Sequence, residues 1–134
     1  MKIAALADIH SNVFALEAVV QNATQRGADS IVNLGDVLYG PIAPRATFEF
    51  LAKHEFVTIC GNQDRLIYEA TVEEIKANPT LQFVLDDLGP EPPGWLKSLP
   101  VDHSISDEVY LCHGAPANDL AYLLEDVKSG KAHV

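Results

Sequence analysis

Short apolar runs alternate with amphipathic segments along the first half of the chain. Buried strands are predicted at 2–7, 30–34 and 56–60. Helices are predicted between them at 13–26, which Gly27 ends, and at 44–53, which begins with a proline. Because strands that alternate with helices pair in parallel through right-handed crossovers, this half predicts an α/β fold built on a parallel sheet.

The pattern changes in the second half, where helical segments follow one another and chain breakers are frequent. Helices are predicted at 65–77 and 81–88, a loop at 89–94 and a short helical turn at 95–99. A strand pair is predicted at 101–105 and 109–112, followed by a last helix at 119–127 with Asp119 as its N-cap. At 134 residues, the chain fits one domain.

Composition and charge limit the kinds of function that the chain can have. Hydrophobic residues make up 48% of the chain, which is enough for a core, but no apolar run reaches the ~18 residues that span a membrane. The net charge of −10 repels nucleic-acid phosphates and excludes a broad nucleic-acid groove. The first residues do not follow the pattern of a secretory signal, so none is predicted here. Cys60 and Cys112 lie in apolar runs without a C-x-x-C pattern, so we predict buried thiols in a reducing cytoplasm, with zinc binding or a disulfide as the minor alternative.

Residues that can bind metal ions follow each of four strand-like runs. Asp8 and His10 follow the first, Asp36 the second, Asn62 the third and His113 the last. Because the carboxyl ends of parallel strands lie along one edge of a sheet, we expect these side chains to converge. Carboxylate, imidazole and amide donors suit Mn, Fe, Zn or a similar ion rather than a thiolate zinc site. Each short motif alone also fits an ordinary turn, so the specificity comes from their order and shared placement.

These motifs resemble those of the calcineurin-like metallophosphoesterase superfamily, in particular its small bacterial and archaeal phosphodiesterase branch. The family's D-x-H, G-D, G-N and H-G motifs match Asp8 with His10, Asp36, Asn62, and His113, in that order. The resemblance covers about residues 1 to 127 and implies a β-sandwich flanked by helices. It also implies two divalent metal ions, Mn, Fe, Zn, Ni or Co, with Mn favoured.

The resemblance assigns roles to the matching residues. Asp8 and His10 would hold the first metal ion, Asp36 would bridge both, and Asn62 and His113 would hold the second. A hydroxide bound to both ions would attack phosphorus, and the ions would stabilise charge on the phosphoryl oxygens.

One departure from the family pattern concerns the catalytic residues, which are predicted to be Asp36, Asn62, Gln63 and Asp64. Gln63 stands where the family has a histidine that contacts the phosphoryl group and helps protonate the leaving oxygen. An amide donates a hydrogen bond but delivers no proton at neutral pH, and general-acid help is worth ~10²–10³-fold in rate. Asp64, which supports that histidine in the family, is expected to pair with Arg65 or to cap the next helix.

A second departure is that the sequence contains no G-H-x-H motif, which in the family supplies a ligand to each metal ion. His133 does not match that motif. The expectation is that residues 1–134 form a single, incomplete metallophosphoesterase domain without its C-terminal strands. A fragment, a truncated product and a homo-oligomer that completes the fold remain open alternatives.

The sequence therefore predicts a divalent-metal-dependent phosphoesterase that hydrolyses phosphomonoesters or phosphodiesters. A non-catalytic scaffold of the same fold, or an inactive fragment, is the alternative that Gln63 and the missing motif favour. A flavodoxin-like binding domain shares the early alternation of strands and helices, but it does not explain Asn62 and His113, and ranks last.

Overall fold

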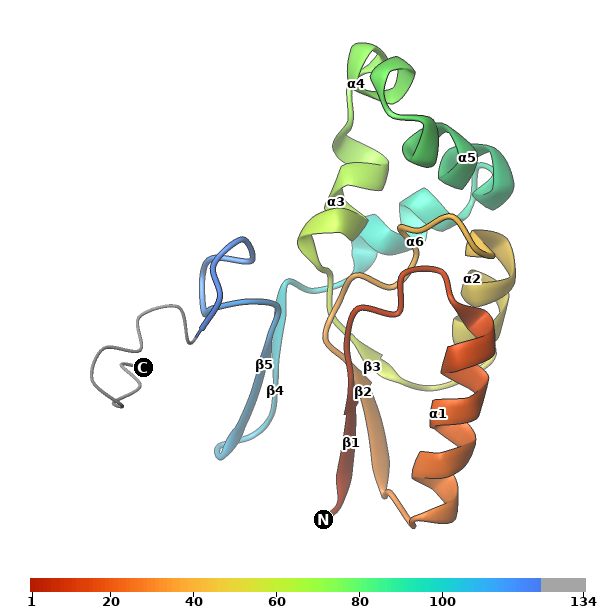
Figure 1. Cartoon of the computed structure of the whole chain (residues 1–134). Coiled ribbons are helices and arrows are strands. Elements are labelled where there is room, and N and C mark those ends of the chain that lie inside the picture. Colours follow the sequence, from red (N-terminus) through yellow and green to blue (C-terminus); the bar gives the residue numbers. More distant parts are fainter. Residues whose placement is uncertain (124–134) are drawn as a thin grey trace, which may run out of the picture.

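The computed structural model of the chain describes residues 1–123 and contains a parallel sheet, a set of helices and a hairpin (Figure 1). The first half consists of β1 (Ile3–Leu6), α1 (Val13–Gln25), β2 (Ser30–Asn33), α2 (Pro44–Ala52) and β3 (Val57–Thr58). The three strands pair in parallel in the order β1-β2-β3, with Ile3 opposite Ser30 and Val32 opposite Val57. The predicted α/β fold on a parallel sheet is confirmed, although β3 is shorter than the predicted strand at 56–60.

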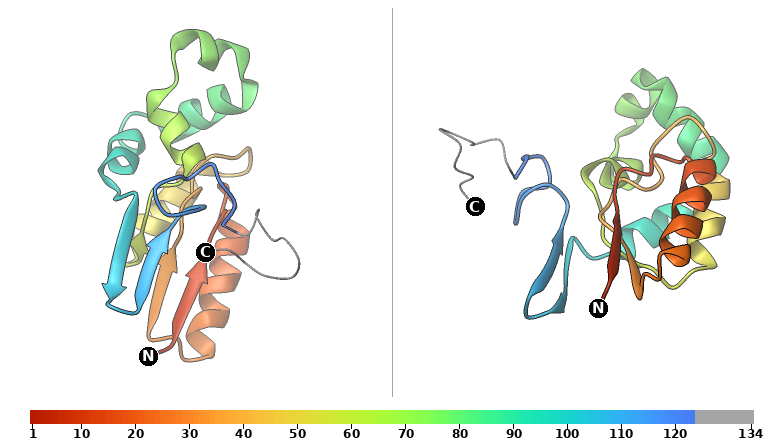
Figure 2. Two further views of the ribbon diagram at one scale, coloured as in Figure 1. Left: turned by 90° about the vertical axis from the view of Figure 1, so that its left-hand side faces the viewer. Right: turned by 60° about the horizontal axis from the view of Figure 1, so that its bottom comes forward.

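The second half adds helices and a separate pair of strands. Its elements are α3 (Asn62–Glu69), α4 (Val72–Ala77), α5 (Pro79–Leu88), α6 (Pro92–Ser98), β4 (Asp102–Ser106) and β5 (Val109–Cys112). The strands β4 and β5 form an antiparallel hairpin, as predicted. Figures 1 and 2 show α1 and α2 on one side of the parallel sheet and the hairpin on the other. The result is a two-sheet arrangement with helices on the outer side of the parallel sheet.

Two apolar clusters hold these layers together. The larger one joins the helices to the sheet-end loops and includes Leu16, Leu38, Phe48 and Leu81. The smaller one lies between the two sheets and consists of Val32, Ile59 and Leu111, which are at most 7% exposed. Burial of each such side chain stabilises the folded state by about 1.5–3 kcal/mol. The smaller cluster thus fixes the hairpin, and with it the end of β5, against the parallel sheet.

Local capping explains where the helices depart from the prediction. The predicted helix at 65–77 is wrong, because the chain forms α3 and α4 with a break at Thr71. The Thr71 N–H donates to Glu74 Oε2 (2.8 Å) and the Glu74 N–H donates to Thr71 Oγ1 (3.3 Å), a reciprocal pair that begins a new helix. The predicted loop at 89–94 is also wrong in its second half, because α6 begins at Pro92, and proline is favoured as a first helical residue.

Some predictions concern the end of the described region. Residues 119–123 are not helical, so Asp119 does not cap a helix there; it pairs with Arg65 instead. The rest of the predicted helix at 119–127, and His133, lie outside the described residues. Within residues 1–123, no helix is long and apolar enough to cross a membrane. Cys60 is buried as predicted, Cys112 is half-buried, and both thiols are free.

A buried carboxylate joins the start of α3 to the loop that follows β2. Asp64 is fully buried, and its Oδ2 accepts a hydrogen bond from the Gly61 N–H (3.1 Å). Its Oδ1 accepts two more, from the N–H groups of Val37 (2.9 Å) and Leu38 (3.2 Å). Burial raises the pKa of Asp64 to about 6, with a further rise from Asp36, while the three N–H groups oppose the shift. Asp64 caps α3, one of the two roles predicted for it, and does not pair with Arg65.

We expect Asp64→Asn to lower the free energy of unfolding by about 1–3 kcal/mol. The new amide keeps one oxygen for Val37 and Leu38 but turns an NH₂ group toward the buried Gly61 N–H. Urea unfolding at pH 8 measures the change. The matched control is Asp86→Asn, at an exposed position of α5, which we expect to stay within about 0.5 kcal/mol of the parent. Equal losses at both positions would contradict the proposed bonding.

Candidate metal centre

The loops after β1 and β2 hold their polar residues in a conformation that side-chain-bearing residues rarely adopt. Asp8, His10 and Asp36 have φ values of 53°, 46° and 55°. Such left-handed residues cost about 1–3 kcal/mol each, so the surroundings must hold them in place. Bonds between the two loops do this, because the Asp8 N–H donates to Gly35 O (3.1 Å) and the His10 N–H donates to Asp36 O (2.9 Å). The strained backbone brings the side chains of both loops to the same edge of the sheet.

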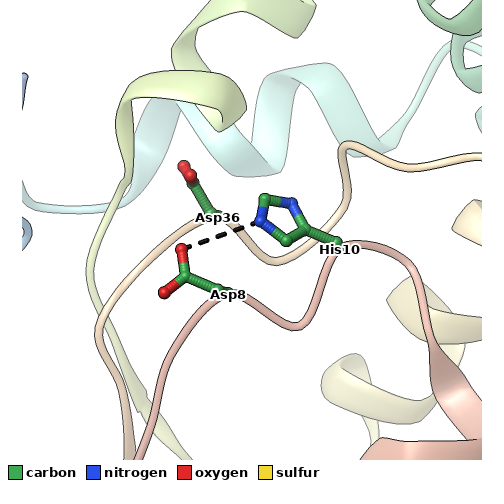
Figure 3. Close-up of side chains that lie close together, drawn as sticks. All are labelled: Asp8, His10 and Asp36. Carbon is green, nitrogen blue, oxygen red and sulfur yellow. Dashed lines mark ion pairs between the residues drawn. The ribbon is translucent and has the colours of Figure 1, made fainter.

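Asp8, His10 and Asp36 form the first donor set. Each offers one ligand atom, and these atoms lie within 4.8 Å of one another; Figure 3 shows the three side chains converging from the two loops. His10 Nδ1 lies 3.0 Å from Tyr39 O. Because a carbonyl only accepts, Nδ1 carries the hydrogen, and in the neutral ring Nε2 presents its lone pair. That Nε2 lies 3.7 Å from Asp8 Oδ1. In the neutral ring this lone pair faces a carboxylate, an arrangement that a cation between the two atoms would stabilise.

Asn62 and His113 form a second donor set, in which a backbone carbonyl again orients the histidine ring. His113 Nδ1 lies 2.7 Å from Leu34 O, which again leaves Nε2 as the free donor atom. This Nε2 lies 3.0 Å from Asn62 Oδ1 and 3.6 Å from Asp36 Oδ2. Three acceptor atoms therefore converge on one another, an arrangement that a bound cation would satisfy. A ring nitrogen fixed by a carbonyl on its other side is typical of metal-binding histidines.

Asp36 lies between the two donor sets and is only 3% exposed. The Gln63 N–H, in the first turn of α3, donates to Asp36 Oδ1 (2.9 Å), where the positive end of the helix dipole also favours a negative charge. Gly61 is required beside it, since a Cβ at that position would overlap the Asp36 side chain and its backbone nitrogen. The sequence Gly61-Asn62-Gln63 thus serves to pack the backbone against Asp36 as well as to present Asn62.

One cleft of about 690 Å³ contains most of the predicted site residues. Its walls include Asp8, His10, Asp36, Asn62, Gln63 and His113. Asp64, also predicted as catalytic, does not line this cleft. It is buried beneath it and accepts hydrogen bonds from backbone N–H groups. The cleft is also lined by Tyr110 and the segment 119–123, which the sequence did not predict. No local pattern marks them, because their placement depends on the fold of the chain after β5.

The donor chemistry fits a divalent metal ion. Asp8, His10 and Asp36 combine carboxylate oxygen with a neutral imidazole, and Asn62 adds an amide oxygen beside His113. Such sets suit Mn, Fe, Zn and related ions. Neither free thiol is needed for either donor set, so the minor zinc-thiolate alternative gains no support from the described geometry.

The comparisons with known proteins agree with this geometry. The family model of the calcineurin-like phosphoesterase superfamily domain matches residues 1–134. The crystal structure of a metallophosphoesterase from Sphaerobacter thermophilus is similar, with 27% sequence identity and a TM-score of 0.74. The similarity covers 92% of this chain and 51% of that one, so the chain spans about half the length of that structure. No curated protein matches the chain. The match along the whole sequence establishes that the chain belongs to the calcineurin-like phosphoesterase superfamily.

Proposed function

We propose that the chain carries the metal-binding part of a hydrolase that cleaves phosphomonoesters or phosphodiesters with two divalent metal ions. The observation that carries this proposal is the position of Asp36 between two donor sets, one with Asp8 and His10 and one with Asn62 and His113. A carboxylate has two oxygens and can therefore serve two ions. Membership of the superfamily supports the same chemistry.

The residues of the centre would divide the work as follows. Asp8 and His10 would hold one ion, Asn62 and His113 the other, and Asp36 both. We propose Mn as the resident metal, with Fe, Zn, Ni and Co as competitors for the same oxygen and nitrogen donors. A bound metal pair supplies an activated water and stabilises charge on the phosphoryl oxygens.

Gln63 lies in the cleft beside Asp36 and Asn62, where its amide would donate a hydrogen bond to a phosphoryl oxygen. It can orient the ester, but it supplies no proton to the leaving oxygen. We therefore propose that the centre favours esters whose leaving group needs little protonation. This residue is also what favours the second candidate function, a non-catalytic scaffold that keeps the fold. The flavodoxin-like alternative is wrong, given the family match.

We propose a phosphate ester as the substrate and a second copy of the chain as a protein partner. Among the described residues β1 forms one edge of the parallel sheet, and an edge strand offers unpaired backbone groups. Beside it lies an apolar groove of about 360 Å³ whose walls include Leu6, Leu16 and Val19. The cytoplasmic compartment stays a prediction of the sequence.

We expect the chain to bind Mn²⁺, and Asp36→Asn to weaken that binding by at least about 100-fold. Replacing a ligand that serves both ions should lower metal affinity by more than the ~10–100-fold that follows from changes of residues next to the ligands. Equilibrium dialysis measures the bound metal, with Asp107→Asn, at an exposed hairpin position, as the matched control. A folded parent chain that binds no Mn²⁺, or equal binding by the parent and Asp36→Asn, would contradict a metal centre at these residues.

We expect Gln63→His to raise the hydrolysis rate of alkyl phosphate esters by about 10²-fold and that of nitrophenyl esters much less. The reason is that a histidine can protonate a poor leaving group, whereas nitrophenolate departs without help. The control is Gln82→His, at an exposed position of α5. If Mn²⁺ binds but neither the parent nor Gln63→His hydrolyses any of these esters, the scaffold function replaces the enzymatic one.

We expect Val19→Lys to weaken self-association of the chain by about 10-fold or more. Val19 is 45% exposed and lines the groove beside β1, so a charge there would have to be buried on pairing. Sedimentation velocity over a concentration series measures the dissociation constant. Val72→Lys, on α4 and 59% exposed, is the control away from that edge. A parent chain that stays monomeric at every concentration would rule out this partner.

A further inference from the structure

Two side-chain contacts connect the start of α3 to the segment that follows β5. One joins Asn62 Oδ1 to His113 Nε2 (3.0 Å). The other joins Arg65 to Asp119, where both Nη atoms of the guanidinium bind the carboxylate, one of them at 3.1 Å. Figure 2 shows the segment after β5 at the same end of the parallel sheet as the start of α3. The elements that carry the second donor set are therefore joined twice.

The first of these contacts would be replaced by shared coordination when a metal ion is bound. In the neutral ring, with the hydrogen on Nδ1 bonded to Leu34 O, Asn62 Oδ1 and the lone pair on His113 Nε2 are both donor atoms for a cation, and neither supplies a hydrogen to the other. Of the two contacts, the one between Arg65 and Asp119 contains no proposed ligand. It is the contact that can persist in both the free and the metal-loaded protein.

The geometry of the pair suits a positioning role. Arg65 follows Asn62 by one turn of α3, on the same side of the helix. On the other element, a turn closed by reciprocal bonds between Ala115 and Asn118 (3.1 and 3.0 Å) leads from His113 toward Asp119. The side chains of Arg65 and Asp119 are 34% and 22% exposed. A two-pronged bond of a partly buried arginine fixes direction as well as distance, unlike a single exposed ion pair.

We propose that the ion pair of Arg65 and Asp119 positions Asn62 and His113 for one of the two metal ions, an inference that rests on the proposed function. Arg65 and Asp119 are positioning residues here and bind no metal themselves. Breaking this pair should weaken metal binding by Asn62 and His113 and leave metal binding by Asp8 and His10 unchanged.

The test separates the two donor sets by removing one at a time. In a chain with Asp8→Ala and His10→Ala, Mn²⁺ binding reports on Asn62 and His113; in a chain with Asn62→Ala and His113→Ala, it reports on the other set. Electron paramagnetic resonance of free Mn²⁺ gives the dissociation constant in each background. We expect Arg65→Gln to raise the dissociation constant for Mn²⁺ about 10-fold or more in the first background, where Asn62 and His113 remain. In the second background, where they are removed, we expect a change of less than about twofold.

The sign of the effect distinguishes positioning from simple electrostatics. Loss of a positive charge near the centre would by itself strengthen the binding of a cation, whereas loss of positioning weakens it. Arg45→Gln is the matched control: Arg45 pairs with Glu49 one turn along its helix, as Arg65 does with Glu69, but it lies on α2 and does not line the cleft. We expect it to leave both dissociation constants unchanged, although it can lower the unfolding temperature.

Thermal unfolding shows whether each variant is folded before metal is added. If Arg65→Gln fails to fold, Arg65→Lys replaces it, since lysine keeps the charge but not the two-pronged bond. Selective weakening in the first background supports the inference. Equal weakening in both backgrounds, or none, overturns it while the proposed function stands. A folded parent chain that binds no Mn²⁺ overturns both.

Discussion

The buried carboxylate of Asp64 is the interaction on which the site depends. It accepts hydrogen bonds from Gly61, Val37 and Leu38, so it fixes the first turn of α3 against the loop after β2. Asp36 lies in that loop, directly before Val37. A buried N–H without an acceptor costs about 1–3 kcal/mol, so these bonds strongly favour one arrangement of the two segments. The chemistry at the surface of the cleft thus depends on a residue that lies beneath it.

The histidines are held by a second set of constraints, this time from backbone carbonyls. Tyr39 O orients His10 and Leu34 O orients His113, so that each ring turns Nε2 toward a carboxylate. Both carbonyls belong to the stretch of chain around Asp36, which makes this one loop the support of both donor sets. Without a cation, the converging carboxylates and lone pairs repel one another. Metal binding should therefore be coupled to the stability of the loop itself.

The sequence predicted the parts of this structure that follow from local pattern. Apolar runs located β1 and β2, and the polar residues at their ends converge because the strands are parallel. The start of α3 was missed because Asn62, Gln63 and Asp64 read as a polar turn, whereas Asp64 caps a helix that begins two residues earlier. The contact of Arg65 with Asp119 was missed for a different reason: it joins positions 54 apart along the chain, and no periodicity encodes such a contact.

The left-handed backbone at Asp8, His10 and Asp36 has a consequence for how these positions can change over evolutionary time. A glycine at any of them would relieve the backbone and favour the folded state, but it would delete a donor atom. Greater stability and the proposed metal binding therefore place opposite demands on the same three positions. In a lineage without a need for the metal, these would be the first positions expected to drift toward glycine or asparagine.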